Sequence, residues 1–226
     1  MMKRTLFVSL LLAGAALCAF AQSGVISEFS GTVELKAAKA ASFVPAKIGA
    51  VVAADTVVST GFRSTAVIKV GSTTIAVRPL TRLSLAEIRA ESDSETLKVD
   101  LQAGRVRVDV KPPAGTRANT SVQSPTATAS VRGTDFEFDA VNLKVYEGTV
   151  VLRGGGDDME IPVPAGASSY VDGYGKAIDP IEANRQSLTP PAPAGTGSSG
   201  KGSSSGAPSS SSSDTGTINV TIREEK

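Results

Sequence analysis

Three carboxylates stand at alternate positions in the stretch TDFEFDA. Successive side chains of a strand point to opposite faces, so Asp135, Glu137 and Asp139 share one face if this stretch is a strand. Carboxylate oxygens grouped in this way can bind a hard cation such as Ca²⁺. Calcium sites usually need converging loop oxygens as well, so the sequence favours a solvated face whose charge a neighbouring basic strand balances. The basic residues available for this are Arg105, Arg107 and Lys144.

Two other acidic clusters suggest a comparison with glycoside hydrolases, which use pairs of carboxylates. Glu91, Asp93 and Glu95 lie in a polar loop, and Asp157 and Asp158 follow a run of glycines. Such clusters are usually solvated turns, and nothing in their spacing brings two carboxylates together around a substrate. An enzyme that acts on envelope glycans is therefore the least favoured function.

The composition excludes most other kinds of catalytic and metal-binding site. The chain has no histidine and no tryptophan, and its one cysteine is Cys18. Ser-His and Cys-His nucleophile pairs and histidine-ligated metal sites are therefore impossible. We predict a protein that is not an enzyme and that uses no cofactor or metal. With 23 basic and 22 acidic residues, the chain also lacks an overall basic field for nucleic acid or anionic lipid.

The first residues resemble an export signal. Two basic residues precede an uncharged apolar run, and the small-x-small pattern of a cleavage site ends at Ala21. We predict a signal peptide over residues 1–21 and a periplasmic or otherwise exported protein. The alternative is an inner-membrane anchor facing the periplasm, because the apolar run approaches the minimum length of a membrane span. A lipoprotein is disfavoured, since Leu17 rather than a small residue precedes Cys18.

Segments that alternate apolar and polar residues recur between Gly24 and about Pro180, with glycine or proline between them. This pattern predicts an all-β domain over residues 24–183, built as a β-helix or other solenoid, a sandwich or a barrel. Helical turns are expected only near residues 83–90 and 181–186. The alternating segments are 31–37, 65–71, 73–79, 96–102, 104–110, 134–140, 142–148 and 149–155.

A short motif recurs within this domain. GTVELK at residues 31–36 returns as GTVVLR at residues 148–153. Stacked rungs that each begin at a glycine corner would produce such a repeat. The alternative is that Gly-Thr-Val only combines turn chemistry with β propensity, and the sequence leaves both interpretations open.

The composition changes after residue 183. Residues 184–215 are rich in serine, glycine and proline and predict a disordered linker, because they have almost no large apolar side chains to bury. Residues 216–226 then predict a short C-terminal strand, in which every second residue from Ile218 to Ile222 is apolar. An isolated strand is unstable in water, so we expect residues 216–222 to add to the edge of this body, of a neighbour or of a partner. A frayed tail is the alternative.

An Arg-Gly-Thr step precedes the strand that contains the three carboxylates. Phe136, on the opposite face of that strand, is a predicted core residue. Gly133 permits a turn that a side chain would forbid, and Thr134 can form a local hydrogen bond. Arg132 can fork several hydrogen bonds onto carbonyls or a carboxylate, so we predict a corner held together by this arginine.

Four segments together resemble the FecR domain. In chain order they are TGFRSTAVIKV, LQAGRVRVDV, SPTATASVRGTDFEF and VYEGTVVL, within Gly24 to Gly155. Each segment is generic alone, but the four in this order are more specific. The motif residues that we single out are Gly104, Arg105, Arg132, Gly133, Thr134, Phe136, Glu147 and Gly148.

The resemblance implies a β-rich, β-helix-like fold on the periplasmic side of a membrane. It also implies signalling, because the named family member carries a signal from an outer-membrane transporter to a sigma factor. This chain shows no cytosolic anti-sigma segment before its apolar run, so we expect an exported FecR-type binding or scaffold module in the cell envelope. Its expected partner is a protein or another envelope component and not nucleic acid. The alternative is a membrane-anchored envelope sensor, and membrane contact is expected only if residues 1–21 are retained.

Overall fold

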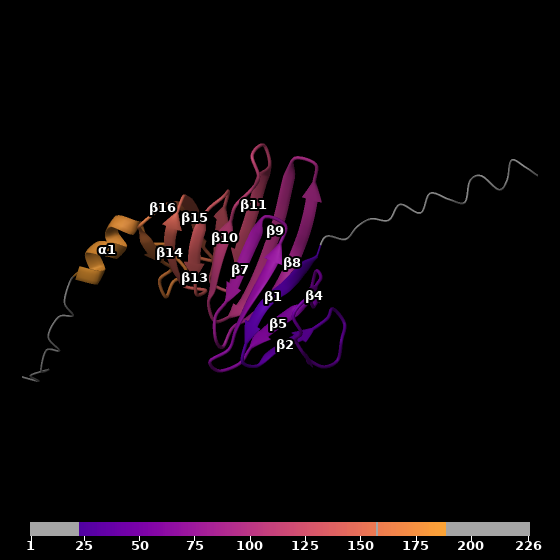
Figure 1. The fold of residues 1–226 in the computed structure, drawn as a ribbon. Coiled ribbons are helices and arrows are strands. Elements are labelled where there is room, and N and C mark those ends of the chain that lie inside the picture. The colour runs from indigo at the N-terminus through magenta and orange to yellow at the C-terminus, as the bar shows by residue number, and fades with distance from the viewer. Residues whose placement is uncertain (1–22, 157, 189–226) are drawn as a thin grey trace, which may run out of the picture. The chain divides into compact units, whose positions relative to one another are not determined.

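The computed structural model describes residues 23–156 and 158–188, which form two β-sheets and one helix (Figure 1). The first sheet contains, in spatial order, β17 (Ser168–Tyr170), β14 (Asn142–Glu147), β13 (Asp135–Phe138), β10 (Val106–Val110), β7 (Thr73–Val77), β6 (Thr65–Val70), β1 (Gly24–Ser30) and β4 (Val51–Val52). The second contains β16 (Glu160–Pro164), β15 (Thr149–Gly154), β12 (Ala127–Val131), β11 (Arg117–Gln123), β9 (Ser94–Ala103), β8 (Arg82–Glu91), β5 (Val57–Thr60), β2 (Val33–Lys36) and β3 (Val44–Pro45). Helix α1 spans Pro180–Leu188.

The chain passes back and forth between the two sheets as it advances along them. Most neighbouring strands are antiparallel, and β9 and β11 pair in parallel because β10 lies between them in sequence but in the other sheet. The predicted all-β fold is therefore confirmed. Its two open sheets make it sandwich-like, and its repeated crossings give it the winding of a flattened solenoid. All eight alternating segments overlap observed strands.

The core fills the space between the sheets. Side chains that point inward from both sheets are buried, among them Phe136, Phe138 and Leu152. Across the core, the hydroxyls of Thr73 on β7 and Thr120 on β11 are 3.5 Å apart, which places the two sheets in direct contact there. The strict alternation of buried and exposed positions along most strands is what a half-buried strand requires.

The expected helical turn near residues 83–90 is wrong, because this segment is strand β8. The register of β8 against β9 shifts between Leu85 and Glu87, where a bulge inserts an extra residue. After the bulge the inward position moves from Leu85 to Ile88, which breaks the period-two pattern. Leucine, alanine and glutamate also favour helices, so the sequence there resembled a helix.

The expected helix near residues 181–186 is confirmed as α1. Its first turn is capped by Asp179, whose carboxylate accepts a hydrogen bond from the backbone N–H of Ile181 at 2.8 Å. Pro180 occupies the first helical position, where its missing N–H has no partner to lose. The helix extends past residue 183, so residues 184–188 belong to α1 rather than to the predicted linker. The rest of the linker and the predicted C-terminal strand lie outside the described residues.

The turns between strands gather at two opposite edges of the sandwich. We call one the Leu80 edge; it comprises residues 61–64, 78–81, 104–105, 124–126 and 139–141. We call the other the Gly133 edge; it comprises residues 71–72, 111–116, 132–134, 148 and 165–167.

The outermost strands of both sheets are poor templates for a further strand. β3 and β4 have two residues each, and residues 171–178 fold back beside β17 through the hydrogen bond from Ile178 N to Tyr170 O. On β16, Ala165 N donates to Gly148 O, so Pro162 and Pro164 occupy positions whose N–H groups would face away from β15. No helix among residues 23–156 and 158–188 is long and apolar enough to span a membrane.

Candidate functional site

The motif residues of the sequence divide between the two edges. Gly133 and Thr134 form the crossing from β12 to β13, and Gly148 forms the next crossing, from β14 to β15. A Cβ atom built on Gly148 would lie 2.6 Å from Thr134 Cγ2, so the Arg-Gly-Thr and Glu-Gly segments meet in space. Gly104 and Arg105 instead lie at the Leu80 edge. Glu147 ends β14 with an exposed side chain, and Phe136 is fully buried as predicted.

The predicted role of Arg132 as the residue that holds this corner together is wrong. Its side chain is exposed and forms no hydrogen bond or ion pair with any residue of the described part of the chain. Positive φ at Gly133, +82°, is confirmed and is the feature that turns the backbone here. The backbone carbonyl of Thr134 then accepts a hydrogen bond from Val110 N at 2.9 Å, which joins the corner to β10.

Arg132→Ala is therefore expected to change the free energy of unfolding by no more than about 0.5 kcal/mol, as for most surface substitutions. Urea denaturation of the two proteins measures this directly. A loss of several kcal/mol would mean that the guanidinium group is engaged in solution and would restore the predicted structural role.

A shared Gly-x-Val arrangement builds three of the crossings. Gly31, Gly104 and Gly148 all have positive φ, and each is followed two residues later by a buried valine. A Cβ atom on any of these glycines would collide with a hydroxyl-bearing side chain, namely Ser64, Thr81 and Thr134 respectively. The recurrence of Gly-Thr-Val in the sequence therefore corresponds to a recurring crossing.

The hydroxyl at such a crossing usually fastens the strand that follows. Ser64 Oγ accepts a hydrogen bond from Thr32 N at 2.8 Å, and Thr81 Oγ1 accepts one from Arg105 N at 2.9 Å. At the third crossing, Thr134 Oγ1 is buried without a hydrogen-bond partner among the described residues. Ser64 and Thr81 therefore fasten their crossings by side-chain hydrogen bonds, whereas Thr134 does not fasten the third in this way.

Thr134→Val is expected to leave stability unchanged or to raise it, because valine keeps the shape and removes a buried, unsatisfied hydroxyl. Thr81→Val is the matched control. It deletes the acceptor of Arg105 N and should lower the free energy of unfolding by about 1–3 kcal/mol. The two denaturant midpoints give the comparison, and a Thr134→Val protein that loses as much stability as Thr81→Val would contradict it.

Strands β7, β10, β13 and β14, with the residues at their ends, bring charged side chains together on the outer face of the first sheet. Arg107 donates two hydrogen bonds to the Asp135 carboxylate, with Nε 2.9 Å from Oδ1 and Nη2 2.5 Å from Oδ2. This hydrogen-bonded pair raises the pKa of Arg107 above its ordinary value. Arg105 lies 3.2 Å from Asp139 and 3.5 Å from Glu137. The predicted balance between the acidic strand and the strand carrying Arg105 and Arg107 is thereby confirmed.

The calcium alternative fails on the same contacts, because each of the three carboxylates already faces an arginine. Arg78 adds a further ion pair to Glu137 at 3.5 Å. Among the described residues no group of three acidic, cysteine or histidine side chains is placed to hold a metal ion.

The other acidic clusters do not form a described catalytic pair. Glu95 accepts hydrogen bonds from the backbone N–H and the hydroxyl of Ser72 and so closes a turn. Glu91 and Asp93 are exposed at the tip of the β8–β9 hairpin, and Asp158 is exposed near the start of β16. Asp157 lies outside the described residues.

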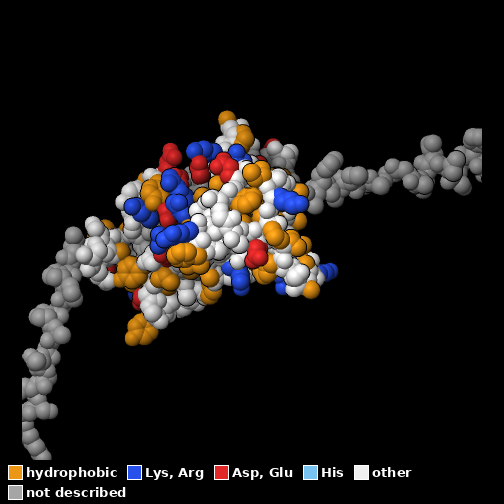
Figure 2. Space-filling view, turned by 60° about the horizontal axis from the view of Figure 1, so that its bottom comes forward, with side chains coloured by type: hydrophobic (Ala, Val, Ile, Leu, Met, Phe, Trp, Pro, Cys, Tyr) orange, Lys and Arg blue, Asp and Glu red, His pale blue; other side chains and the backbone are white. Residues whose placement is uncertain are grey.

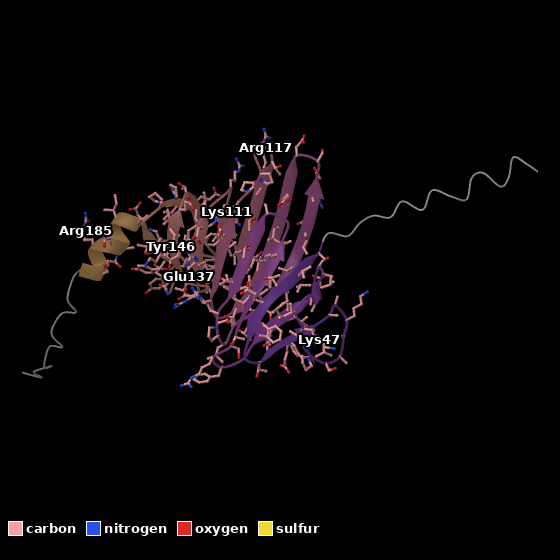
Figure 3. The ribbon with its side chains drawn as sticks, viewed as in Figure 1. Lys47, Lys111, Arg117, Glu137, Tyr146 and Arg185 are labelled. Atoms are coloured by element: carbon pink, nitrogen blue, oxygen red, sulfur yellow. The ribbon has the colours of Figure 1, made fainter. Side chains whose placement is uncertain are left out.

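A groove of about 1140 Å³ adjoins this charged face and is the best candidate for a binding site. It lies between the outer faces of β13 and β14, strand β17 with the turn before it, and helix α1. Figure 3 shows Glu137 and Tyr146 on this side of the first sheet. The side chains with polar or aromatic groups in its lining include Arg105, Glu137, Asp139, Lys144, Tyr146 and Tyr170.

Contacts within the groove fix several of these groups in place. The hydroxyl of Tyr146 donates to Glu137 Oε2 at 3.2 Å, while the Tyr146 ring stacks against the guanidinium of Arg107 at 4.5 Å from its centroid. The hydroxyl of Tyr170 donates to Gln186 Oε1 and links β17 to α1. Lys144 has no carboxylate partner among the described residues, and its ammonium group lies 5.3 Å from the centre of the Tyr146 ring.

Sequence reasoning found the charged strands of this site and missed the groove. Arg105 was singled out, and Lys144 was considered only as a balancing charge. Tyr146 and Tyr170 were not identified, because nothing in their local sequence distinguishes them from other strand tyrosines. The turn before β17 and helix α1 come from distant parts of the chain, and only the fold brings them to β14.

Comparison with known proteins finds a family model that matches part of the chain. Residues 56–151 match the family model described as FecR protein. Over these residues, from the turn before β5 into β15, the match supports the resemblance to the FecR domain. Strands β1 to β4 lie before the matched region, although the sequence resemblance had been drawn from Gly24 onward. No curated protein sequence matches the chain.

Two solved structures resemble the described fold in part. Both are crystal structures of a protein described as an anti-sigma factor from Parabacteroides distasonis. Each is 15% identical over 57% of this chain, with TM-scores of 0.44 and 0.43. This chain covers 63% and 62% of those structures, which is less than two thirds of their length.

Proposed function

We propose that this protein is an exported, non-enzymatic FecR-type module that binds a protein partner in the cell envelope. FecR domains are regulatory and envelope-associated, which supports a role in signalling rather than catalysis. The observation that carries the proposal is the groove beside β14. It combines exposed aromatic surface with charges that are held in place, and such a surface suits recognition.

The charges of the groove argue for binding rather than chemistry. Glu137 and Asp139 are each engaged by arginine, so neither is free to act as a general acid or base. Tyr146 lies against Arg107 and Glu137 and is therefore oriented before any partner arrives. A site that is ordered in advance loses less conformational entropy on binding.

The groove is tested by a photo-cross-linking residue placed at Lys144 in the full chain in living cells. Gln123, exposed on the outer face of the second sheet, is the matched control position. We expect a discrete protein adduct from position 144 and none from position 123. Equal labelling from both positions, or no adduct from position 144, would contradict binding in the groove.

Export is tested by the intact mass of the native protein together with cell fractionation. We expect a soluble periplasmic protein that begins at Gln22. A protein that retains Met1 in the inner-membrane fraction would instead support the second candidate, a membrane-anchored envelope sensor. The apolar run at residues 5–16 is the observation that favours this candidate.

We further propose that residues 216–222 add as a strand to the sheet of the partner. The alternating apolar residues Ile218, Val220 and Ile222 support this. Deleting residues 214–226 should then reduce recovery of the adduct formed at position 144. Unchanged recovery would remove the tail from the proposed interaction.

A further inference from the structure

Three turns of the Leu80 edge adopt a left-handed backbone at residues that carry side chains. At the Leu80 edge, three residues other than glycine have positive φ: Arg63 at +54°, Leu80 at +56° and Ala140 at +75°. At the Gly133 edge the positive-φ residues are Gly71, Gly115, Gly133, Gly148 and Gly166, while Lys39 and Asp55, outside both sets of turns, are the other residues with side chains and positive φ in the described part of the chain. A side chain disfavours this conformation, because Cβ approaches the following carbonyl oxygen. The Leu80 edge therefore has three residues with side chains, Arg63, Leu80 and Ala140, at positions where the backbone is strained.

Packing accounts for only one of these three residues. Ala140 packs against the core. Leu80 does not, since 61% of its surface is exposed, and Arg63 is exposed beside Phe62, which is 72% exposed. Glycine at position 80 would relieve the strain and expose less apolar surface. A strained backbone that presents an apolar side chain to solvent indicates a contact made outside the chain.

The exposed apolar residues lie on neighbouring turns. Leu80 N donates to Gly61 O at 3.2 Å, so the turn that carries Phe62 lies beside the turn that carries Leu80. A hollow of about 680 Å³ separates Leu80 from Val141, which is 36% exposed. Gly104 lines this hollow between the two apolar side chains.

Arginines surround the same surface. Arg78 and Arg105 line the hollow, and the guanidinium of Arg63 lies 5.3 Å from the centre of the Phe62 ring. Asp139 also lines the hollow, where it is paired with Arg105, and Arg78 and Arg105 share Glu137. Arg63 has no carboxylate partner in the described part of the chain. Figure 2, with the Leu80 edge brought toward the viewer, shows basic and hydrophobic side chains interspersed on this face.

We propose that the Leu80 edge docks onto the surface of a membrane that contains anionic phospholipid. Phe62 and Leu80, at the tips of adjacent turns, would enter the boundary between headgroups and acyl chains, while Arg63 stays at the level of the phosphates. The near-neutral charge of the whole chain does not oppose this, because the contact depends on the cation of Arg63 at this edge and not on the net charge. The proposal goes beyond the proposed function and needs no N-terminal anchor.

Vesicle co-sedimentation tests the proposal. The chain from Gln22 onward is suitable, because every buried core residue lies between Ile26 and Ala177. We expect it to sediment with vesicles of equal parts phosphatidylglycerol and phosphatidylcholine and to be released as sodium chloride is raised. Vesicles of phosphatidylcholine alone should retain far less. Arg63→Gln should lower the partition coefficient about fivefold, since one arginine near an anionic surface contributes about 1 kcal/mol.

Matched controls distinguish binding through this surface from nonspecific effects of charge and hydrophobicity. Arg117→Gln removes the same charge at the opposite edge, where Figure 3 labels Arg117, and should bind like the unaltered protein. Phe62→Ser and Leu80→Ser should each reduce binding, whereas Val44→Ser, at an exposed valine of β3, should not. Absence of binding by the unaltered chain would overturn the proposal, and so would an Arg117→Gln loss equal to that of Arg63→Gln. A protein captured at this edge without vesicle binding would make it a protein interface and would also overturn it.

Discussion

Phe136→Ala is expected to lower the free energy of unfolding by about 3–5 kcal/mol, the range found when a buried phenylalanine is truncated. Phe136 is fully buried in the middle of the core, on a strand whose neighbours on both sides also belong to the first sheet. Removing the ring takes away its transfer free energy and leaves a cavity that two rigid sheets cannot close. Urea denaturation followed by circular dichroism measures the loss.

Phe62→Ala is the matched control for this substitution. It removes the same ring from a side chain that is 72% exposed, so stability should change by no more than about 0.5 kcal/mol. The slope of the free energy with urea should stay unchanged in both variants, because neither alters the surface exposed on unfolding by much. A loss below about 1 kcal/mol for Phe136→Ala would mean that the sheets do not close around this ring.

The alternation of residues predicted the strands where nothing interrupts the period of two. The segments around Val67, Val108 and Leu152 alternate without a break, and each is a strand that buries one face. Strand β8 was missed because its bulge moves the inward face by one residue after Leu85. Strands β11 and β12 were also missed. Their inward side chains include alanine and threonine, which give a weak hydrophobic signal.

The corner motif was predicted correctly in its backbone and wrongly in its side chains. Positive φ at Gly133 follows from the identity of the residue, because glycine alone adopts it without strain. Whether Arg132 points into the corner or into solvent depends on the strands packed around it, and those are distant in sequence. The hydroxyls that do fasten crossings, on Ser64 and Thr81, come from turns 32 residues after and 24 residues before the backbone N–H groups that they bind.

The groove was beyond local sequence reasoning for a similar reason. Its charged residues were found because Arg105, Glu137 and Asp139 lie in two sequence segments, 104–110 and 134–140, that alternate regularly. Its remaining wall comes from β17 and α1, which reach β14 only after the chain has crossed to the second sheet and returned. A single sequence does not indicate that the chain returns to the first sheet beside β14. The family motif does not indicate it either, because the motif covers only the strands that it includes.

Gly104→Ala is expected to lower the free energy of unfolding by about 2–5 kcal/mol, and Gly115→Ala by only about 1–2 kcal/mol. The two glycines have the same φ, +89°, so both substitutions introduce the same left-handed strain. The two positions differ in the space available to a Cβ atom. A Cβ atom on Gly104 would lie 2.4 Å from Thr81 Oγ1 and 2.5 Å from Thr81 Cα, while nothing lies within 4 Å of the corresponding position on Gly115.

The difference between the two variants therefore measures how tightly this crossing is packed. Thr81 forms hydrogen bonds with both the backbone N and O of Arg105. Thr81 therefore cannot move away from a new Cβ atom without also displacing Arg105, which lines the groove. Gly104→Ala should accordingly also reduce cross-linking from position 144, whereas Gly115→Ala should leave it intact. Equal stability losses in the two variants would mean that Thr81 moves aside freely, and the Gly-x-Val crossing would then be a flexible turn rather than a fixed support for Arg105.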